Sequence, residues 1–575
     1  MRLHWFLPAS GNQSKLKRFL SMLGPTWTSC PVRRVIQSIC LIAFFLLFLY
    51  VCWPYGSSHY AESFAAKEIV EAELFLVLDP LLSISTAIAG RMWVPSLSWA
   101  LAVLATCLVL PRGFCAYICP LGTLLDLFDW VIGRKVTRDR PRPDGRLSSI
   151  RYYALGAVLV AAALGVMLSG FVSALAVLTR AMLFVAGSIQ IGLLKGWYLV
   201  PPMNAGHWIA IAMFALLIAL SLVEKRFWCK YVCPTGAVFS IANLLRLAER
   251  KVRSRCTECT KCEDMCSFSA INSDYSTKQL NCSFCQSCAG VCPVGAIEFT
   301  GRWDRGGCKL ERAEGNGQLL VRRNLLRGIG AVALGAGVPV ATCKVTGDDG
   351  VLIRPPGSVP ERDFLRVCVR CGQCIKVCPN NVLQPVGLEH GFNALWTPEV
   401  TPNWSGCAPS CNTCGQVCPT GAIRALDLPE KRVARIGLAV VDKGACLPYA
   451  NGEPCQLCVD ECHAAGYDAI EFIRVGGETG RNGEPVEGSG VLAPAVLKES
   501  CVGCGLCQMR CKAINVKEKH LLKEAAIQVL AGPDKEDRLH SGSYSELRDQ
   551  RARRQKAGEN SPQDRGSDYL PSFLR

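Results

Sequence analysis

Cysteines recur along the chain at spacings that suit iron–sulfur clusters. The sequence holds 34 cysteines among 575 residues, which is far above ordinary usage for so long a chain. The spacing C-x2-C-x2-C-x3-C-P is typical of bacterial ferredoxins, in which three cysteines bind one [4Fe–4S] cube and the fourth binds the other cube of a pair. The length excludes a small disulfide-stapled domain, so we expect the thiols to bind metal.

Two such motifs follow one another between residues 256 and 292, the first with Ser267 in place of the usual proline. A zinc ribbon needs two separated C-x2-C pairs, whereas each motif packs four cysteines into eleven residues, which argues against zinc. Crossed ligation predicts one cube on Cys256, Cys259, Cys262 and Cys292, and a second on Cys282, Cys285, Cys288 and Cys266.

Four further motifs lie between residues 368 and 511. The second has a widened first gap, the third has an insertion and His463 where proline is usual, and the fourth is followed by Lys512. Disulfides are the competing interpretation, which four consecutive motifs disfavour. Six clusters are therefore predicted in all. The cysteines of this second set are Cys368, Cys371, Cys374 and Cys378; Cys407, Cys411, Cys414 and Cys418; Cys446, Cys455, Cys458 and Cys462; and Cys501, Cys504, Cys507 and Cys511.

Two more cysteine pairs belong to an internal repeat. The segment that begins at Arg112 (RGFCAYICPLG) matches the one that begins at Arg226 (RFWCKYVCPTG), at an offset of 114 residues. On a helix, cysteines at i and i+4 share one face, so the two halves offer four thiolates to one additional iron–sulfur centre. Packed or redox-active thiols without metal are the open alternative. The pairs are Cys115 with Cys119 and Cys229 with Cys233.

Apolar stretches around this repeat predict a membrane domain. Mean hydropathy is +0.23, and four runs reach the roughly 20 residues that cross a bilayer: 35–53, 92–110, 152–172 and 199–223. A shorter run, 181–194, is expected to be re-entrant or interfacial. The segments 1–34, 112–151 and 224–255 hold 22 Lys and Arg, against 4 in 54–93 and 173–206. This asymmetry predicts that the N-terminus and the first ferredoxin domain are cytoplasmic.

A second targeting feature lies between the two motif sets. Arg322 and Arg323 precede a Gly/Ala-rich apolar stretch, which resembles a twin-arginine export signal. Because that route carries folded proteins, the four-cluster domain is predicted to be periplasmic; a cytoplasmic helix or linker is the alternative.

No C-x-x-C-H, G-x-G-x-x-G or Walker pattern is present, and histidines are scarce, so no haem, NAD, flavin or nucleotide is expected. The net charge of +16 gathers beside the spans, which favours a membrane over nucleic acid.

The predicted fold is multi-domain: an α-helical membrane bundle with four main spans and a pseudo-repeat, joined to α+β bacterial ferredoxin-like [4Fe–4S] domains. The expected parts are a basic cytoplasmic segment, the membrane domain, a two-cluster domain, a twin-arginine-like signal or fifth membrane segment, a four-cluster domain and a polar tail expected to be disordered. Their bounds are 1–34, 35–250, 251–315, 316–350, 351–532 and 533–575.

These motifs resemble two known families joined in one chain. Residues 31–300 resemble the NapH and MauN membrane-bound ferredoxin-type proteins, and residues 321–519 resemble the NapG and MauM four-cluster proteins, exported by the twin-arginine route. The second set also resembles the four-cluster subunits of molybdoenzymes, which implies that the outer two motifs exchange fourth ligands, as do the inner two. That grouping joins Cys511 to Cys368, Cys371 and Cys374; Cys378 to Cys501, Cys504 and Cys507; Cys462 to Cys407, Cys411 and Cys414; and Cys418 to Cys446, Cys455 and Cys458.

The resemblance implies a function in respiration. The chain is expected to be a multi-pass protein of the bacterial inner membrane, the quinol dehydrogenase type of electron-transfer component. It would pass electrons from membrane quinol to a periplasmic reductase or other acceptor. No catalytic residue and no quinol site is assigned. The alternatives are a CcoG-like metal-reducing assembly factor, which needs no second motif set, and a NosR-like regulatory or maturation protein.

Overall fold

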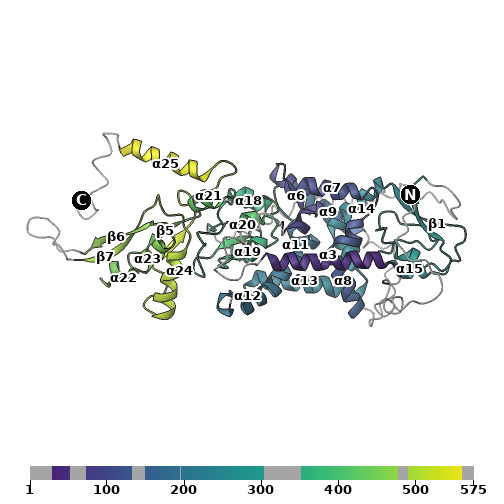
Figure 1. Cartoon of the computed structure of the whole chain (residues 1–575), viewed down its shortest axis with the longest axis horizontal. Coiled ribbons are helices and arrows are strands. Elements are labelled where there is room, and N and C mark those ends of the chain that lie inside the picture. The colour runs from purple at the N-terminus through teal and green to yellow at the C-terminus, as the bar shows by residue number, and fades with distance from the viewer. Residues whose placement is uncertain are drawn as a thin grey trace, which may run out of the picture.

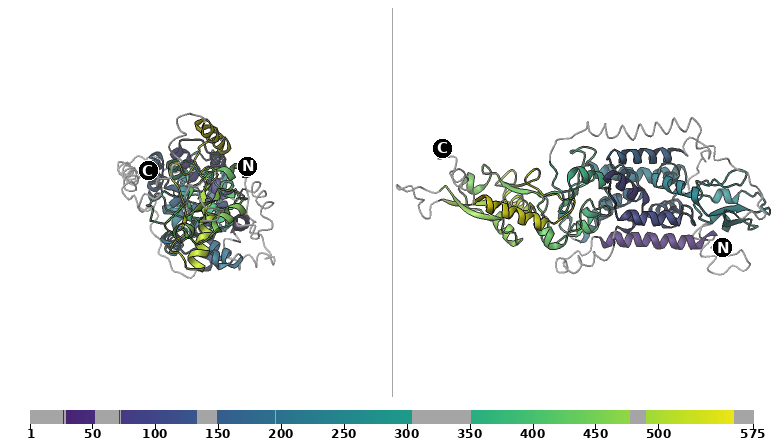
Figure 2. Two further views of the ribbon diagram at one scale, coloured as in Figure 1. Left: turned by 90° about the vertical axis from the view of Figure 1, so that its left-hand side faces the viewer. Right: turned by 90° about the horizontal axis from the view of Figure 1, so that it is seen from above.

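The computed structural model is elongated and has three parts along its long axis (Figure 1). It describes residues 27, 29–51, 71, 73–132, 149–194, 196–303, 351–476 and 490–559. A helical bundle formed by residues 29–247 occupies the middle. The part formed by 248–303 lies at one end and the part formed by 351–559 at the other, and the view from above in Figure 2 shows the same order. The two cysteine-rich parts therefore lie at opposite ends of the bundle.

The first half of the bundle begins with a long helix whose two faces differ. On α3 (Pro31–Tyr50), Arg33, Gln37 and Phe44 are buried, whereas the apolar side chains at 35, 39, 42, 46 and 49 are exposed. That three-and-four spacing puts the exposed apolar row on one face, which suits contact with lipid. The elements that follow are α5 (Leu74–Val77), α6 (Pro80–Gly90), α7 (Ser96–Thr106), the π-helical turn η2 (Phe114–Ile118) and α8 (Pro120–Val131).

The second half repeats this order, and equivalent contacts hold it together. Arg33 Nε donates a hydrogen bond to the carbonyl oxygen of Ala116 (3.2 Å), and Arg151 Nη1 donates to that of Lys230 (3.2 Å), which is 114 residues further on. The sequence repeat is therefore also a structural repeat. Its elements are α9 (Ile150–Ala163), α10 (Ser169–Val172), α11 (Ala174–Met182), η5 (Leu183–Gly187), α12 (Ser188–Leu194), η6 (Trp197–Leu199), α13 (Ala205–Val223), η7 (Trp228–Val232), α14 (Pro234–Ala242) and η8 (Asn243–Leu245).

The number of long apolar helices differs from the prediction. Within the described residues, three helical runs are long and apolar enough to cross a membrane, by length and composition: Pro31–Tyr50, Ala174–Leu194 and Ala205–Val223. The stretch 181–194, expected to be re-entrant or interfacial, is instead the second half of an unbroken 21-residue run. Two expected spans hold the shorter helices α7 and α9, and after α9 Gly165 has a φ of +84°. Hydropathy alone does not register such a break.

Residues 248–303 form a small α+β unit docked on the bundle. Strand β1 (Ala248–Val252) pairs antiparallel with β2 (Ile297–Gly301), and the short helices α15 (Lys261–Met265) and α16 (Ser287–Gly290) lie between them in the sequence. Tyr117 Oη donates to the carbonyl oxygen of Phe284 (2.9 Å), and Gly290 leaves no room for a Cβ atom beside the Ser29 carbonyl. The unit is therefore held directly against one end of the bundle.

Residues 351–559 form a second α+β part of short elements. Its strands pair antiparallel as β3–β4, β5–β8 and β6–β7. The helices and strands in chain order are α18 (Glu361–Val367), α19 (Gln373–Val377), β3 (Leu383–Pro385), β4 (Pro398–Val400), α20 (Thr413–Gln416), α21 (Leu428–Val433), β5 (Leu438–Val441), α22 (Leu447–Ala450), α23 (Leu457–Ala464), β6 (Ile470–Val475), β7 (Val491–Val496), α24 (Leu506–Cys511), the π-helical η10 (Lys512–Glu518), β8 (Ile527–Leu530) and α25 (Tyr544–Glu559).

Buried arginines fasten this part to the bundle. Arg180 Nη1 donates to the carbonyl oxygen of Arg370 (3.1 Å), and Arg370 Nη1 donates to that of Met167 (2.8 Å). The Arg180 guanidinium lies 3.7 Å from the centre of the Trp396 ring, a favourable cation–π distance. Gly170 meets the Val369 carbonyl so closely that a Cβ atom would clash. The docking is thus an interlocked backbone contact.

The expectation of a disordered tail from residue 533 was wrong for the stretch up to 559. Tyr544 is 1% exposed and packs with Leu426 and Ala434, and Arg551 makes two contacts of 2.6 and 2.8 Å with Asp537. One aromatic anchor thus orders a segment whose composition indicated disorder. Residues 560–575 and the twin-arginine-like segment 316–350 lie outside the described residues.

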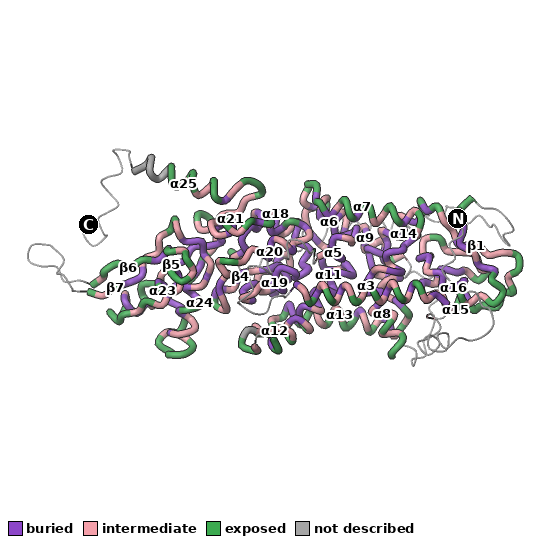
Figure 3. Tube along the Cα trace, viewed as in Figure 1, coloured by how far each residue is buried: buried purple, intermediate pink, exposed green. Residues whose placement is uncertain are grey.

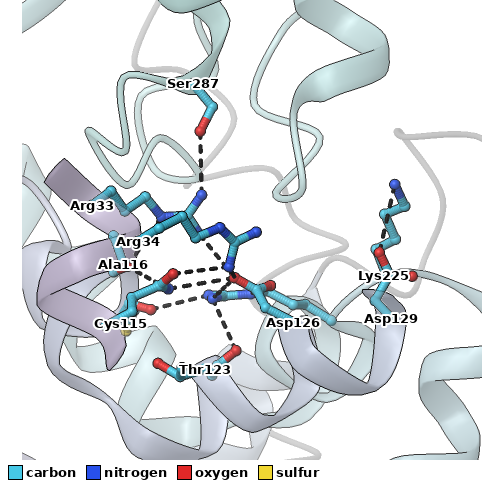
Figure 4. Close-up of polar contacts among 12 residues, drawn as sticks. Arg33, Arg34, Cys115, Ala116, Thr123, Asp126, Asp129, Lys225 and Ser287 are labelled. Carbon is cyan, nitrogen blue, oxygen red and sulfur yellow. Dashed lines mark hydrogen bonds and ion pairs between the residues drawn. The ribbon is translucent and has the colours of Figure 1, made fainter. Parts of the chain in front are cut away.

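A buried carboxylate connects the two halves of the bundle. Asp126 of α8 accepts from Arg33 (3.1 Å), Arg34 (2.8 Å) and Arg226 (2.7 Å), as Figure 4 shows for the first two. Burial alone would raise the pKa of Asp126, but the three guanidinium groups hold it well below its usual range. The ion-pair network therefore joins α3 and α8 to the segment before η7.

We expect Asp126→Asn to destabilise the bundle strongly. The substitution leaves three arginines, two of them almost fully buried, without their counter-charge, and breaking a buried ion pair costs about 3–5 kcal/mol. The thermal unfolding midpoint in detergent should fall well below that of the wild type. Asp129→Asn is the matched control, because its 3.7 Å pair with the half-exposed Lys225 contributes about 0–1 kcal/mol. Equal midpoints for the two variants would contradict this account.

Candidate iron–sulfur centres

The two motifs of residues 248–303 place their cysteines around two cavities. The structure brings together the same groups that crossed ligation indicates, so the fourth cysteine of each motif lies with the first three of the other. One cavity is lined by Cys256, Cys259, Cys262 and Cys292, and the other by Cys266, Cys282, Cys285 and Cys288.

A strained turn shapes four of the six motifs. The residues on either side of the second cysteine both have a positive φ, a conformation that side chains other than glycine rarely adopt. In the two irregular motifs, the residues before α20 and α23 have negative φ values. Strain of this kind persists where the surroundings hold it, commonly at functional sites. The residues are Glu258 and Thr260, Phe284 and Gln286, Arg370 and Gly372, and Gly503 and Gly505.

In the second set, consecutive motifs exchange their fourth cysteines. Helix α19 packs on α20, and α23 packs on α24, so the first two motifs form one unit and the last two another. The fourth cysteines therefore cross within each unit. Three cavities are lined by Cys378 with Cys407, Cys411 and Cys414; by Cys462 with Cys501, Cys504 and Cys507; and by Cys511 with Cys446, Cys455 and Cys458.

The remaining fourth cysteine completes the pattern. Cys418 interacts electrostatically with Cys368, Cys371 and Cys374. The expected exchange between the outer two motifs and between the inner two was therefore wrong. The reason is geometric, because helix packing within each unit brings neighbouring motifs together and keeps the first away from the fourth.

Backbone N–H groups point at the fourth cysteines. Ala270 N and Ala296 N each lie 3.2 Å from Cys266 Sγ and Cys292 Sγ, and Ala469 N lies 3.3 Å from Cys462 Sγ. Hydrogen bonds to ligand sulfurs stabilise thiolates and tune cluster potentials. The sequence gives no signal for these donors, because the spacing from cysteine to donor varies between motifs.

Several of the thiols lie in surroundings that disfavour their ionisation, whereas for Cys285 burial alone would raise the pKa but Arg33 and hydrogen bonds lower it. Burial raises the pKa of Cys282, Cys378 and Cys504 to about 12 each. Metal binding requires the thiolate and releases its proton, so the metal supplies the positive charge that such a buried group lacks. Four cysteines around one cavity fit the ligand set of a [4Fe–4S] cluster.

Buried basic side chains lie beside several cysteine groups. Arg250 is 4% exposed and interacts electrostatically with Cys288 and Cys262. Lys431 is also 4% exposed; burial alone would lower its pKa, but the Cys407 group raises it above its usual value. Each cation offsets negative charge on neighbouring sulfurs, an effect that spacing motifs do not reveal.

The repeat cysteines also come together, inside the bundle. Cys119 and Cys233 are the residues that precede α8 and α14, and each follows a π-helical turn that carries Cys115 or Cys229. Each pair therefore straddles the junction between a π-turn and a new helix, where we had expected one continuous helical face. The four sulfurs lie within electrostatic range of one another.

Two family models match the chain at these sites. A model described as a 4Fe-4S binding domain matches residues 92–139 and 206–253, which hold the two repeat segments. A model described as a 4Fe-4S dicluster domain matches residues 367–423. The latter range spans the first two motifs of the second set, in agreement with their crossing as one unit. No solved structure matches the chain.

Curated relatives each match a part of the chain. The methylamine utilization ferredoxin-type protein MauM of Paracoccus denitrificans is 35% identical over 207 residues, which is 36% of this chain and 83% of MauM. The ferredoxin-type protein NapG of Escherichia coli is 32% identical over 37% of this chain and 86% of NapG. The ferredoxin-type protein NapH of Haemophilus influenzae is 28% identical over 40% of this chain and 77% of NapH.

These findings confirm the prediction of [4Fe–4S] clusters and indicate electron transfer as the general function. The apolar helices indicate association with a membrane. The matches cover 83% of MauM at 35% identity and 86% of NapG at 32% identity, which is enough to assign the family. The chain belongs to the family of ferredoxin-type iron–sulfur proteins that includes MauM and NapG.

Proposed function

We propose that the chain is a quinol dehydrogenase type of electron-transfer protein, which takes electrons from membrane quinol and delivers them to a periplasmic acceptor. The observation that carries this proposal is the position of the two cysteine-rich parts at opposite ends of one helical bundle (Figure 1). The exposed apolar row of α3 and the apolar helices α11 to α13 are suited to a bundle that lies in a lipid bilayer.

Six [4Fe–4S] clusters are assigned to the six cysteine groups. When bound, each cluster supplies a one-electron redox centre whose potential depends on hydrogen bonds to sulfur, net charge and burial. The chain contributes to each potential through the thiolates, the backbone N–H donors and the buried cationic side chains described above. The groups are Cys256, Cys259, Cys262 and Cys292; Cys282, Cys285, Cys288 and Cys266; Cys368, Cys371, Cys374 and Cys418; Cys407, Cys411, Cys414 and Cys378; Cys446, Cys455, Cys458 and Cys511; and Cys501, Cys504, Cys507 and Cys462.

The chain joins a NapH-like membrane part and a NapG-like four-cluster part. In the single chain the two parts are in direct contact, because Gly170 packs against the Val369 carbonyl and Arg180 donates a hydrogen bond to the carbonyl oxygen of Arg370. The excess of Lys and Arg beside the spans supports a cytoplasmic location for the 248–303 part. The 351–559 part, at the other end of the bundle, is then periplasmic. The third and fourth motifs lie furthest from the bundle, so the acceptor is expected to approach there (Figure 1).

Quinol should reduce the purified full-length protein under anaerobic conditions, bleaching its visible iron–sulfur absorbance, and should drive reduction of an added soluble acceptor. Cys371→Ser alters the cysteine group nearest the bundle and should block electron delivery to the acceptor. The two clusters of the cytoplasmic part should still be reduced, as EPR would show. Cys40→Ser, outside every motif, is the control and should behave as the wild type. A protein that dithionite bleaches but quinol does not would refute the quinol assignment.

The ligand grouping predicts which substitutions act on the same cluster. Cys378→Ser and Cys414→Ser should change the same EPR signal, and the double variant should lose no more iron than the more severe single variant, because both cysteines serve one cluster. Combining Cys378→Ser with Cys504→Ser should instead lose the iron of two clusters. If iron loss were additive for Cys378→Ser with Cys414→Ser and non-additive for Cys378→Ser with Cys504→Ser, the results would support exchange of fourth ligands between the outer two motifs and between the inner two.

A further inference from the structure

We propose that Cys115, Cys119, Cys229 and Cys233 together bind one additional [4Fe–4S] cluster inside the bundle, shared by the two halves of the repeat. The family model that matches these segments specifies neither the ligands nor a shared centre. The binding site stands on its own observations. Its role as the link between the two cysteine-rich parts rests on the proposed function.

The four sulfurs converge in one buried place. Cys119 interacts electrostatically with Cys115 and Cys229, and Cys233 interacts with all three. Cys119 is 9% and Cys233 5% exposed, both belong to one hydrophobic core, and Cys115 and Cys229 pack against it. Four cysteine thiolates are the full ligand set of a [4Fe–4S] cube. Each half of the repeat supplies two.

Helices begin around this place, and their N-termini carry partial positive charge. Asp79, at the start of α6, accepts from Ser173 Oγ (2.6 Å) at the start of α11 and from Thr235 Oγ1 (3.4 Å) at the start of α14. Gly236 N lies 3.4 Å from Cys233 Sγ, in the geometry of a helix cap. The Asp79 carboxylate already accepts at these three helix starts, so the direct contribution of a helix N-terminus to the thiols is the Gly236 N–H donor at Cys233.

An unpaired arginine beside the thiols supplies the second observation. Arg112 and Arg226 occupy equivalent positions, each with its guanidinium against the glycine of the other segment, Gly236 or Gly122. Arg226 pairs with Asp126 at 2.7 Å, but the position equivalent to Asp126 in the second half is Ser240.

Arg112 is fully buried without a carboxylate partner among the described residues. Its Nε and Nη2 lack hydrogen-bond partners there, its Nη1 reaches two carbonyl oxygens at 3.4 Å, and its guanidinium lies 5.1 Å from the centre of the Phe268 ring, a contact that brings no negative charge. A buried, uncompensated charge is costly. Arg112 interacts electrostatically with Cys115 and Cys229. A cluster held by four thiolates carries the negative charge that this guanidinium requires.

The site lies between the two cysteine-rich parts. Tyr117, located between Cys115 and Cys119, donates to the carbonyl oxygen of Phe284, which is adjacent to Cys285. On the other side, Cys371 belongs to the same buried core as Cys119 and Cys233, and Figure 3 shows buried segments running through the bundle into that part. The four repeat cysteines would hold a one-electron centre between the group that includes Cys285 and the group that includes Cys371. Each transfer along this line would oxidise the donor, reduce the next centre and move no proton.

The test compares the full-length double variant Cys119→Ser/Cys233→Ser with Cys40→Ser, isolated anaerobically in membranes. We expect the double variant to contain about four iron and four sulfide ions fewer per chain, with the EPR signals of the ferredoxin motifs retained. Equal iron and sulfide in the two variants would overturn the proposal. Wild-type zinc that disappears in the double variant would also overturn it.

Arg112→Gln provides a test that preserves all ligands. Loss of the neighbouring positive charge should leave iron content unchanged and lower the midpoint potential of one cluster, because the reduced form loses stabilisation. An unchanged set of potentials would overturn the assignment of Arg112 as counter-charge to a cluster. A wild type that holds the additional cluster but is not reduced by quinol would refute the proposed quinol function and leave this site standing.

Discussion

Negative charge on buried sulfur needs positive charge close by, and this requirement organises the whole chain. Cysteines stand in groups of four, and burial disfavours the thiolate at several of them, such as Cys282 and Cys378, so these positions depend on metal and on neighbouring donors. Arg250, Lys431 and Arg112 are nearly or fully buried beside such groups. The same physical need therefore recurs in residues 248–303, in the four-cluster part and inside the bundle.

The bundle meets this need with a repeat that is symmetric in backbone and asymmetric in charge. Arg33 and Arg151 donate to carbonyl oxygens that lie 114 residues apart, those of Ala116 and Lys230, which fixes the two halves against the π-helical turns that carry the cysteines. Asp126 compensates Arg226, whereas Ser240 leaves Arg112 uncompensated. Arg226 thus holds the two halves together, whereas Arg112 is available to compensate the negative charge of a group bound by the four central thiols.

The sequence predicts the cysteine groups of residues 256–292 well because each group depends on local spacing. In the second set the partner of Cys418 depends on packing of α19 on α20, which spacing does not encode. Hydropathy finds apolar stretches but misses the break at Gly165 and the continuity from Ala174 to Leu194. Composition misses the ordering effect of Tyr544. The repeat shows in the sequence that Ser240 stands where Asp126 would recur, but only the structure shows that Arg112 is buried without another carboxylate partner among the described residues.

The central claim is that the two cysteine-rich parts face opposite sides of a membrane, with the bundle between them. Proteolysis of sealed vesicles in both orientations tests it most directly. Protease outside right-side-out vesicles should cleave the 351–559 part and spare residues 248–303, and inverted vesicles should give the reverse. Cleavage of both parts from the same side, in vesicles shown to be sealed, would contradict the account.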